Sequence, residues 1–438
     1  MLNVVETFSG IGSQTEALKN AGIEHRVSAI VEWEIGAMYA YDIIHHGKQD
    51  LSKYRKHTKE TLIERLAQYN LSTDGKSLAS FQSIATMSMH QLKSILHAIE
   101  NNNNLVDITQ VHAKDLESNI DVLTYSFPCQ DLSVSSHWWK NTSGITKGSG
   151  NRSSLLWEIE RILKEFSESK KTMPKFLLME NVPAILGKLH IDNFNLWRKE
   201  LESLGYYNQT YTLNAKNFGI PQGRERTYML SIYIGENLEK YTLLEQYFFE
   251  NNLEHIQLAP DNINSLKNYL KLDYRIEKYR KEAIASTPNF TPSREKIFLN
   301  NPWLATDNKI NHGKIARTIT TKQDRNPNSG IITYSEGKEL VDGCKYRNLT
   351  PREAFLLMGF KEESFDLLMS ENINYNVAKD RPFLPDSKVL KLCGNSIVVN
   401  VLEQIFLQFV FIKDNLFKRI DEPSENKMSK DVGEAIGY

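Results

Sequence analysis

The stretch ETFSGIGSQTEAL, residues 6–18, decides the fold because it ends an apolar run, turns through two glycines and starts an amphipathic pattern. The run LNVVETF is typical of a buried strand, and SQTEALKNAG is typical of a helix that ends at Gly22. A strand, a glycine turn and a helix in this order begin a βαβ unit. The sequence therefore predicts an α/β fold with a mostly parallel sheet flanked by helices.

The same alternation continues to about residue 235. Apolar runs predict further strands at VSAIVEW, DVLTYSF, KFLLMEN, YNQTYTLN and RTYMLSIYI, with helical stretches such as SSLLWEIERILKEF between them. Residues 45–104 interrupt this pattern with a charged, helix-favouring sequence that ends in NNNN, which we interpret as a helical insertion. We expect residues 1–235 to form the larger of two domains, since 438 residues exceed what a single core usually holds.

The character of the sequence changes after residue 235. Residues 236–385 are predicted to form a smaller domain whose first part, to about residue 314, is polar, rich in Tyr and Asn and punctuated by proline. Between residues 262 and 314 there are ten Lys and Arg against five Asp and Glu. Such a local excess suits a phosphate-facing surface, although a solvated helix face is the alternative. Residues 386–415 are predicted to form a helix that returns to the larger domain, and 416–438 a mobile tail.

Composition excludes several classes of protein. The three cysteines, Cys129, Cys344 and Cys393, are far apart and lack CxxC spacing, so we expect neither a disulfide framework nor a metal site. The N-terminal sequence enters a strand pattern without a basic leader, and no run reaches the roughly 18 apolar residues of a spanning helix. We expect a cytoplasmic protein that does not contact a membrane. The net charge of −1 gives no global sign of a polyanionic partner.

Two motifs indicate a nucleoside cofactor. Gly10 and Gly12 let a ligand approach the backbone N–H groups, and the acidic Glu32, about twenty residues on, suits a ribose diol. Trp33 beside it offers a face for adenine. The pyrophosphate fingerprint lacks its third glycine, so S-adenosylmethionine fits better than NAD or FAD. A tight turn without a ligand is the alternative interpretation.

Three further motifs carry reactive or charged groups. Cys129 follows a predicted strand and a restraining Pro128, at the edge of the sheet where α/β proteins bind ligands, although free cysteines are often inert core residues. Glu180 ends the strand KFLLMEN at the same edge, where partial burial would raise its pKa; a helix cap is the alternative. Arg224 and Arg226 alternate on one strand and suit a carboxylate, a phosphate or a base carbonyl, although exposed edge arginines are common.

Taken in order, these stretches resemble the C5-cytosine DNA methyltransferases. The blocks that carry the resemblance are FSGIG, EW, DIT, SFPCQDLS, RSSLLWEIERIL, LLMENV, GIPQGRER, ARTITTKQ and CGNSIVVNVLEQI. They follow one another from residue 4 to about residue 407. The sequences of the insertion and of YSFPCQDLS most resemble those of the branch that includes the mollicute CpG methylases. The basic segment of residues 262–314 does not resemble that branch.

The resemblance implies a bacterial, restriction–modification type of enzyme that methylates C5 of a cytosine flipped out of duplex DNA. Cys129 would add to C6, Glu180 would contact N3 and the exocyclic amine, and Arg226 with Arg224 would hold O2 and the neighbouring structure. A methyltransferase fold of the Rossmann type and a smaller target-recognition domain are expected. The resemblance also implies residues for S-adenosylmethionine: Phe8, Gly10, Ile11, Gly12, Glu32, Trp33, Asp107, Ile108, Pro128, Leu155, Asn395 and Ser396. Ser13 departs from the glycine of many members.

The resemblance leaves the target sequence, the base that removes the C5 proton and any cognate restriction endonuclease open. We expect a monomer. One rival function is that of a family member that methylates tRNA, against which Gln130 and the long 236–314 segment speak. Two more distant rivals are a catalytically dead DNA-binding protein and an oxidoreductase on a dinucleotide fold.

Overall fold

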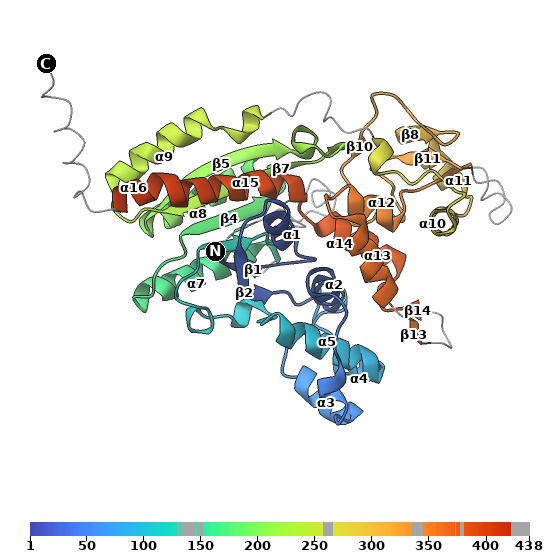
Figure 1. The fold of residues 1–438 in the computed structure, drawn as a ribbon, viewed down its shortest axis with the longest axis horizontal. Coiled ribbons are helices and arrows are strands. Elements are labelled where there is room, and N and C mark those ends of the chain that lie inside the picture. Colours follow the sequence, from blue (N-terminus) through green and yellow to red (C-terminus); the bar gives the residue numbers. More distant parts are fainter. Residues whose placement is uncertain are drawn as a thin grey trace, which may run out of the picture.

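The centre of the protein is a six-stranded sheet with the strand order β2-β1-β3-β4-β7-β5 (Figure 1). The computed structural model describes residues 1–128, 132, 145–146, 152–256, 266–334, 345–372, 374–376 and 381–421. The strands of this sheet are β1 (Leu2–Thr7), β2 (His25–Val31), β3 (Val122–Tyr125), β4 (Phe176–Asn181), β5 (Tyr206–Asn214) and β7 (Glu225–Tyr233). Strand β7 runs opposite to the five other strands of this sheet. The predicted mostly parallel α/β sheet is therefore confirmed.

Each face of the sheet has its own layer of helices, because successive strand residues point to opposite faces. Val4 and Leu178 belong to the core on one face, and Val5 and Met179 belong to the core on the other. The first face packs with α1 (Ser13–Asn20), α9 (Leu238–Glu250) and α15 (Val399–Phe411). The second packs with α7 (Leu156–Glu168) and α8 (Ile191–Ser203).

The segment 45–104, predicted as a helical insertion, folds beside α2 (Ile35–His46). It contains α3 (Lys59–Leu66), α4 (Phe81–Ala85) and α5 (Met89–Asn101). Leu62, Leu92 and Leu96 form a separate small core with Ile35 and Met38 of α2. The insertion is therefore built onto the helix that follows Glu32, close to the ends of the central strands.

A second, four-stranded sheet has the order β12-β11-β8-β9 and lies apart from the first (Figure 1). Its strands are β8 (Trp303–Thr306), β9 (Lys309–Ile310), β11 (Ile331–Thr333) and β12 (Tyr346–Arg347). Its neighbouring helices are α10 (Glu277–Ala285), α11 (Pro292–Asn300), α12 (Pro351–Leu356), α13 (Glu362–Glu371) and α14 (Asp386–Asn395). The short strand β10 (Ala316–Arg317) pairs with β6 (Gln222–Gly223), directly before Arg224. This pairing ties the second part of the chain to the start of β7. A further two-stranded pairing joins β13 (Asn374–Asn376) to β14 (Arg381–Pro382).

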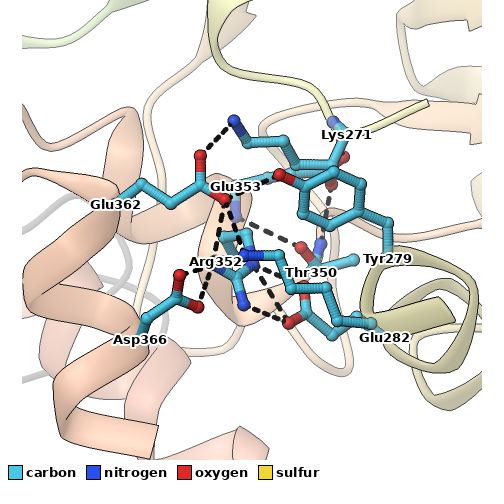
Figure 2. Close-up of polar contacts among 9 residues, drawn as sticks. Lys271, Tyr279, Glu282, Thr350, Arg352, Glu353, Glu362 and Asp366 are labelled. Carbon is cyan, nitrogen blue, oxygen red and sulfur yellow. Dashed lines mark hydrogen bonds and ion pairs between the residues drawn. The ribbon is translucent and has the colours of Figure 1, made fainter. Parts of the chain in front are cut away.

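A charged network holds α10 against α12 and α13 (Figure 2). Arg352 is almost fully buried and pairs with Glu282, Glu362 and Asp366. A second pair, between Arg347 and Glu353, is bidentate at 2.8 and 2.8 Å, with both side chains fully buried. Paired buried charges of this kind fix the relative placement of the elements that carry them, because neither partner can be left alone at low cost.

Two elements lie differently from the sequence expectation. Helix α9 falls in the segment 236–385 but packs on the central sheet, where Tyr247 stacks on Phe411 at 5.2 Å and Phe248 on Tyr207 at 5.8 Å. Its aromatic face supplies the apolar contact that decides its position. Residues 416–421, expected in the mobile tail, continue the last helix to Asp421 because Leu416 and Phe417 pack against the core. Residues 422–438 lie outside the described part of the chain.

The helical segment Asp386–Phe417 has the length and hydropathy of a membrane span, which is true of no other described helix. Phe409 within it stacks on Phe176 of β4 at 4.6 Å, and much of its apolar surface belongs to the main core. We therefore assign this segment, which contains α14 and α15, to the core of the protein.

Candidate active site

A cavity of about 1400 Å³ lies at the carboxyl ends of β1 to β4, where open α/β sheets bind ligands. Its size exceeds the roughly 300–1,000 Å³ of sites for a single small molecule, so it has room for two. The sequence-predicted residues among those that line it are Phe8, Gly10, Ile11, Glu32, Trp33, Asp107, Ile108, Pro128, Leu155, Glu180, Arg224, Arg226, Asn395 and Ser396. The structure thus brings most of the predicted residues together.

The glycine turn after β1 forms one wall of the cavity. Gly10 donates its backbone N–H to Oε2 of Glu32 at 2.9 Å, and Glu34 donates its own to Oε1 at 2.7 Å. Burial raises the pKa of Glu32 to about 7. Gly12 has a φ of +80°, and a Cβ there would lie 2.1 Å from Nε2 of His45, so only glycine fits. Gly12 therefore determines the shape of the turn through its close approach to His45.

Ser13, the departure from the family pattern, begins α1 without a positive φ. A side chain at this position costs no backbone strain.

A second wall comes from the segment before Asp107. Asn104 is buried; its side chain accepts the N–H groups of Glu32 and Val106 at 3.0 and 2.9 Å and donates to the carbonyl of Glu32 at 2.9 Å. Val106 adopts a φ of +62°, a strained conformation for a β-branched residue of the kind found at functional sites. Asn104 thus holds the strand end of Glu32 and the loop of Asp107 at a fixed distance.

The chemistry of these walls fits a nucleoside. Two carboxylates, Glu32 and Asp107, can accept hydrogen bonds from hydroxyl and amino groups, while Trp33 and Ile108 offer apolar surface to a ring. Among the described residues, no cluster of three His, Cys, Asp or Glu side chains is arranged to hold a metal ion.

The opposite side of the cavity carries the reactive groups. Oε1 of Glu180, at the end of β4, lies 3.2 Å from Nε of Arg226, and both side chains are largely buried. Burial raises the pKa of Glu180, an effect that Arg226 and Arg224 partly offset. A carboxyl that remains protonated to higher pH next to a guanidinium can donate one hydrogen bond while the arginine donates another.

Cys129 lies outside the described residues, but the backbone that leads to it is fixed by two side chains. Asn181 donates to the carbonyl of Phe127 at 3.1 Å, and Ser153 donates to the carbonyl of Pro128 at 2.7 Å. The chain therefore enters Cys129 from the same sheet edge that carries Glu180.

Comparison with known proteins identifies the family. The profile of the C-5 cytosine-specific DNA methylases matches residues 76–410. The chain belongs to this family. The methylase is 32% identical to the orphan methyltransferase M.SssI of Spiroplasma monobiae, over 92% of this chain and 96% of that protein. It is 35% identical to the Type II methyltransferase M2.ScrFI of Lactococcus lactis subsp. cremoris, over 93% and 98% of the two chains.

Solved structures share the fold of the methylase. The crystal structure of the Dnmt2 methyltransferase of S. pombe superposes with a TM-score of 0.57 at 18% identity, covering 94% of this chain and all of that one. At this identity the likeness extends to the fold alone. The expectations of a DNA (cytosine-5-)-methyltransferase and of a methyltransferase fold are confirmed by these comparisons together.

Arg224 of the methylase is engaged differently from Arg226. Its buried guanidinium donates to the backbone carbonyls of Ile319, Gly394 and Ser396 at 2.9, 3.1 and 2.7 Å. It thereby joins the start of β7 to the ARTITTKQ block and to the end of α14. Arg224 thus holds the neighbouring backbone and also lines the cavity, and its contact with the base stays a prediction.

Residues 386–415, which include Asn395 and Ser396, were expected to form one helix. Instead α14 ends at Asn395, Ser396 follows as its C-cap, and α15 begins only at Val399. The sequence pattern conceals this break because apolar residues continue through Ile397 and Val398. Both polar residues still line the cavity.

Sequence reasoning missed the residues that act through others, among them Asn104, Ser153 and Asn181. Asn181 directly follows Glu180 and Asn104 ends the NNNN run, but neither position signals a distant backbone partner. Their hydrogen bonds span 25 to 72 positions of the chain.

Proposed function

We propose that this methylase flips a cytosine out of duplex DNA, adds Cys129 to C6 and methylates C5 within a short specific sequence. The observation that carries the proposal is the Glu180–Arg226 pair at the edge of the sheet that leads into Cys129. This pair shares one cavity with the nucleoside-binding wall, and the cavity has room for a base and a cofactor.

The proposed cofactor is S-adenosylmethionine, which supplies an electrophilic methyl group on its sulfonium. Glu32 would hold the ribose, Trp33 and Ile108 the adenine, and Asp107 its amino group. Phe8 and the turn of residues 10–12 would face the methionine part, together with Asn395 and Ser396. Pro128 and Leu155 would complete the lining.

Cys129, Glu180 and Arg226 each have a separate role in the proposed reaction. The thiolate of Cys129 forms a bond to C6, because C5 of cytosine is not nucleophilic until this addition makes the ring an enamine. Glu180 delivers its proton to N3, and Arg226 holds O2 where charge develops. After C5 has gained the methyl group, loss of the C5 proton breaks the C6–S bond and releases Cys129.

The proposed partner is double-stranded DNA, bound between the larger domain and the second sheet. Extrusion of a base costs a few kcal/mol, which contacts to the backbone must offset. The local excess of Lys and Arg in residues 262–314 supports phosphate contacts there. We place the enzyme in the cytoplasm as a monomer.

Pairing with a restriction endonuclease is also part of the proposal. The two relatives described above differ in this respect by name, one being an orphan and the other a Type II enzyme. A cognate endonuclease would make loss of the methylase lethal to cells that retain the nuclease.

The main rival is a tRNA methylase with the same chemistry. Methyl incorporation into duplex DNA and into tRNA, measured side by side, separates the two, and bisulfite sequencing of DNA from expressing cells then gives the site. We expect incorporation into DNA only. Incorporation into tRNA alone would overturn the DNA substrate, and binding of NAD without S-adenosylmethionine would point to an oxidoreductase. A folded protein that binds DNA without methylating it would be a catalytically dead DNA-binding protein.

A further inference from the structure

A loop of the helical insertion lines the cofactor side of the cavity. This insertion loop, residues 70–77, contributes Asn70, Thr73, Asp74, Gly75 and Lys76 to the lining. It pairs with the strand end that carries the ribose-binding group: Ser72 donates to the carbonyl of Trp33 at 2.8 Å, and Ile35 donates to the carbonyl of Ser72 at 2.9 Å. The loop is therefore attached directly beside Glu32.

The insertion loop is also held by helix α14. Lys388 of α14 donates to the carbonyl of Thr73 at 2.7 Å, and Lys391 donates to that of Asp74. Both lysines also pair with Glu34. Gly75 has a φ of +68°, and a Cβ there would lie 2.6 Å from Oε2 of Glu34, so only glycine allows this approach.

Internal hydrogen bonds fix the shape of the loop. Ser72 donates its hydroxyl to the carbonyl of Ser77 at 2.6 Å and accepts the N–H of Gly75 at 2.9 Å. Oδ1 of Asp74 accepts the N–H groups of Lys76 and Ser77 at 2.8 and 3.0 Å. These bonds give residues 72–77 one defined position, and the buried Leu71 joins Asn70 to them.

Asn70 contacts the carboxylate that faces the adenine in the proposed function. Its Nδ2 donates to Oδ2 of Asp107 at 2.7 Å, while Oδ1 of Asp107 accepts the N–H of Thr109 at 3.0 Å. The hydroxyl of Thr109 also donates to Oδ1 at 2.9 Å, so two bonds to Oδ1 and one to Oδ2 fix the rotation of the carboxylate. A carboxylate oxygen accepts about two hydrogen bonds, so Oδ2, which accepts only the bond from Asn70, can still receive an amino group.

We propose that the insertion loop is part of the cofactor site and that Asn70 is a positioning residue, which orients Asp107 toward the 6-amino group of adenine. The inference rests on the proposed binding of S-adenosylmethionine. A purine with an oxygen at C6 presents an acceptor to Asp107 instead of a donor, so the oriented carboxylate would discriminate against it.

Calorimetric titration with S-adenosylhomocysteine and with S-inosylhomocysteine tests this role. We expect Asn70→Ala to weaken binding of the adenosyl compound about three- to tenfold, the value of one hydrogen bond, and to leave the inosyl compound unchanged. Asn20→Ala is the matched control, because Asn20 makes a similar exposed bond to Glu403 at 3.0 Å outside the cavity.

Three outcomes overturn the inference. If Asn70→Ala binds both compounds as the wild type does, Asn70 has no role. If both compounds weaken equally, the residue only supports the fold. If the wild type binds neither compound, the cofactor assignment fails and the inference fails with it. If the wild type binds the adenosyl compound, the cofactor assignment stands, and a failure of the Asn70→Ala prediction then counts against the role of Asn70 alone.

Discussion

Replacement of Arg224 by alanine separates a positioning arginine from one that contacts the substrate. The guanidinium donates to three buried carbonyls, at 2.9, 3.1 and 2.7 Å, that belong to two segments far along the chain. Each hydrogen bond to a charged group contributes about 1.5–3 kcal/mol, but the variant also loses a buried charge and admits water. We therefore expect Arg224→Ala to lower the free energy of unfolding by about 3–5 kcal/mol.

Urea denaturation followed by fluorescence measures this loss, and Arg226→Ala provides the comparison. Arg226 makes one largely buried ion pair with Glu180, whose raised pKa lets it take up a proton when its partner is removed, so Arg226→Ala should lower stability less than Arg224→Ala while abolishing methylation. An Arg224→Ala protein that is as stable as the wild type but inactive would refute the positioning role and indicate that Arg224 contacts the target cytosine.

Buried charges give three further predictions. Glu180→Gln should reduce the methylation rate about 10²- to 10⁴-fold. The wild-type rate should fall as pH rises past the raised pKa of Glu180, and the variant should not show this fall. A variant with the same pH–rate profile as the wild type would exclude Glu180 as the acid. Burial raises the pKa of Glu6 from 4.5 to about 7, so its ionisation destabilises the folded state as pH rises through this interval. Urea denaturation should show that the free energy of unfolding of Glu6→Gln rises by about 2 kcal/mol relative to that of the wild type between pH 5.5 and pH 8. A difference that does not change with pH would contradict the raised pKa of Glu6. Glu353→Gln leaves the buried charge of Arg347 without its partner, so chemical denaturation should show a free energy of unfolding lower by about 3–5 kcal/mol. The control Glu277→Gln, at an exposed ion pair, should leave it almost unchanged. Equal effects of the two variants would argue against the buried pair.

The strands of the central sheet were predictable because each is a short apolar run bounded by turn residues. The run DVLTYSF contains β3, and KFLLMEN contains β4. Local pattern sufficed there, since burial on both faces of a parallel sheet leaves a continuous apolar signal. The position of α9 was not predictable, because its amphipathic face fits either domain and only tertiary packing selects the sheet.

The NNNN run illustrates what the sequence could not reveal. Asn101 and Asn102 both donate to Oδ1 of the buried Asp42 at 2.8 Å, and Asn103 donates to a backbone carbonyl of β2 at 2.8 Å. Asn104 bridges Glu32 and Val106. Four identical residues that resemble a polar loop thus bond to three different residues, Asp42, Ser28 and Glu32, that lie 59 to 75 positions away.

The candidate site was predictable to the level of motifs, because the ends of the strands place Glu32, Glu180 and Pro128 at one edge. The roles of Arg224 and Asn70 were not. Arg224 stands in a motif with Arg226, and sequence spacing does not distinguish a guanidinium that faces a cavity from one that binds backbone carbonyls. Asn70 reaches the site only because the insertion folds back onto the end of β2.

The central claim, that Cys129 attacks C6 of a cytosine, is tested most directly by covalent trapping. Duplex DNA in which 5-fluorocytosine replaces cytosine presents every target sequence, and the fluorine at C5 prevents the final elimination. With S-adenosylmethionine present, we expect the wild type and Cys393→Ala to form a denaturation-resistant complex with DNA, since burial raises the pKa of Cys393 to about 12 and keeps that thiol inert. Cys129→Ser should form none. A wild-type enzyme that methylates ordinary DNA without being trapped, or a Cys129→Ser variant that is trapped equally, would contradict the account.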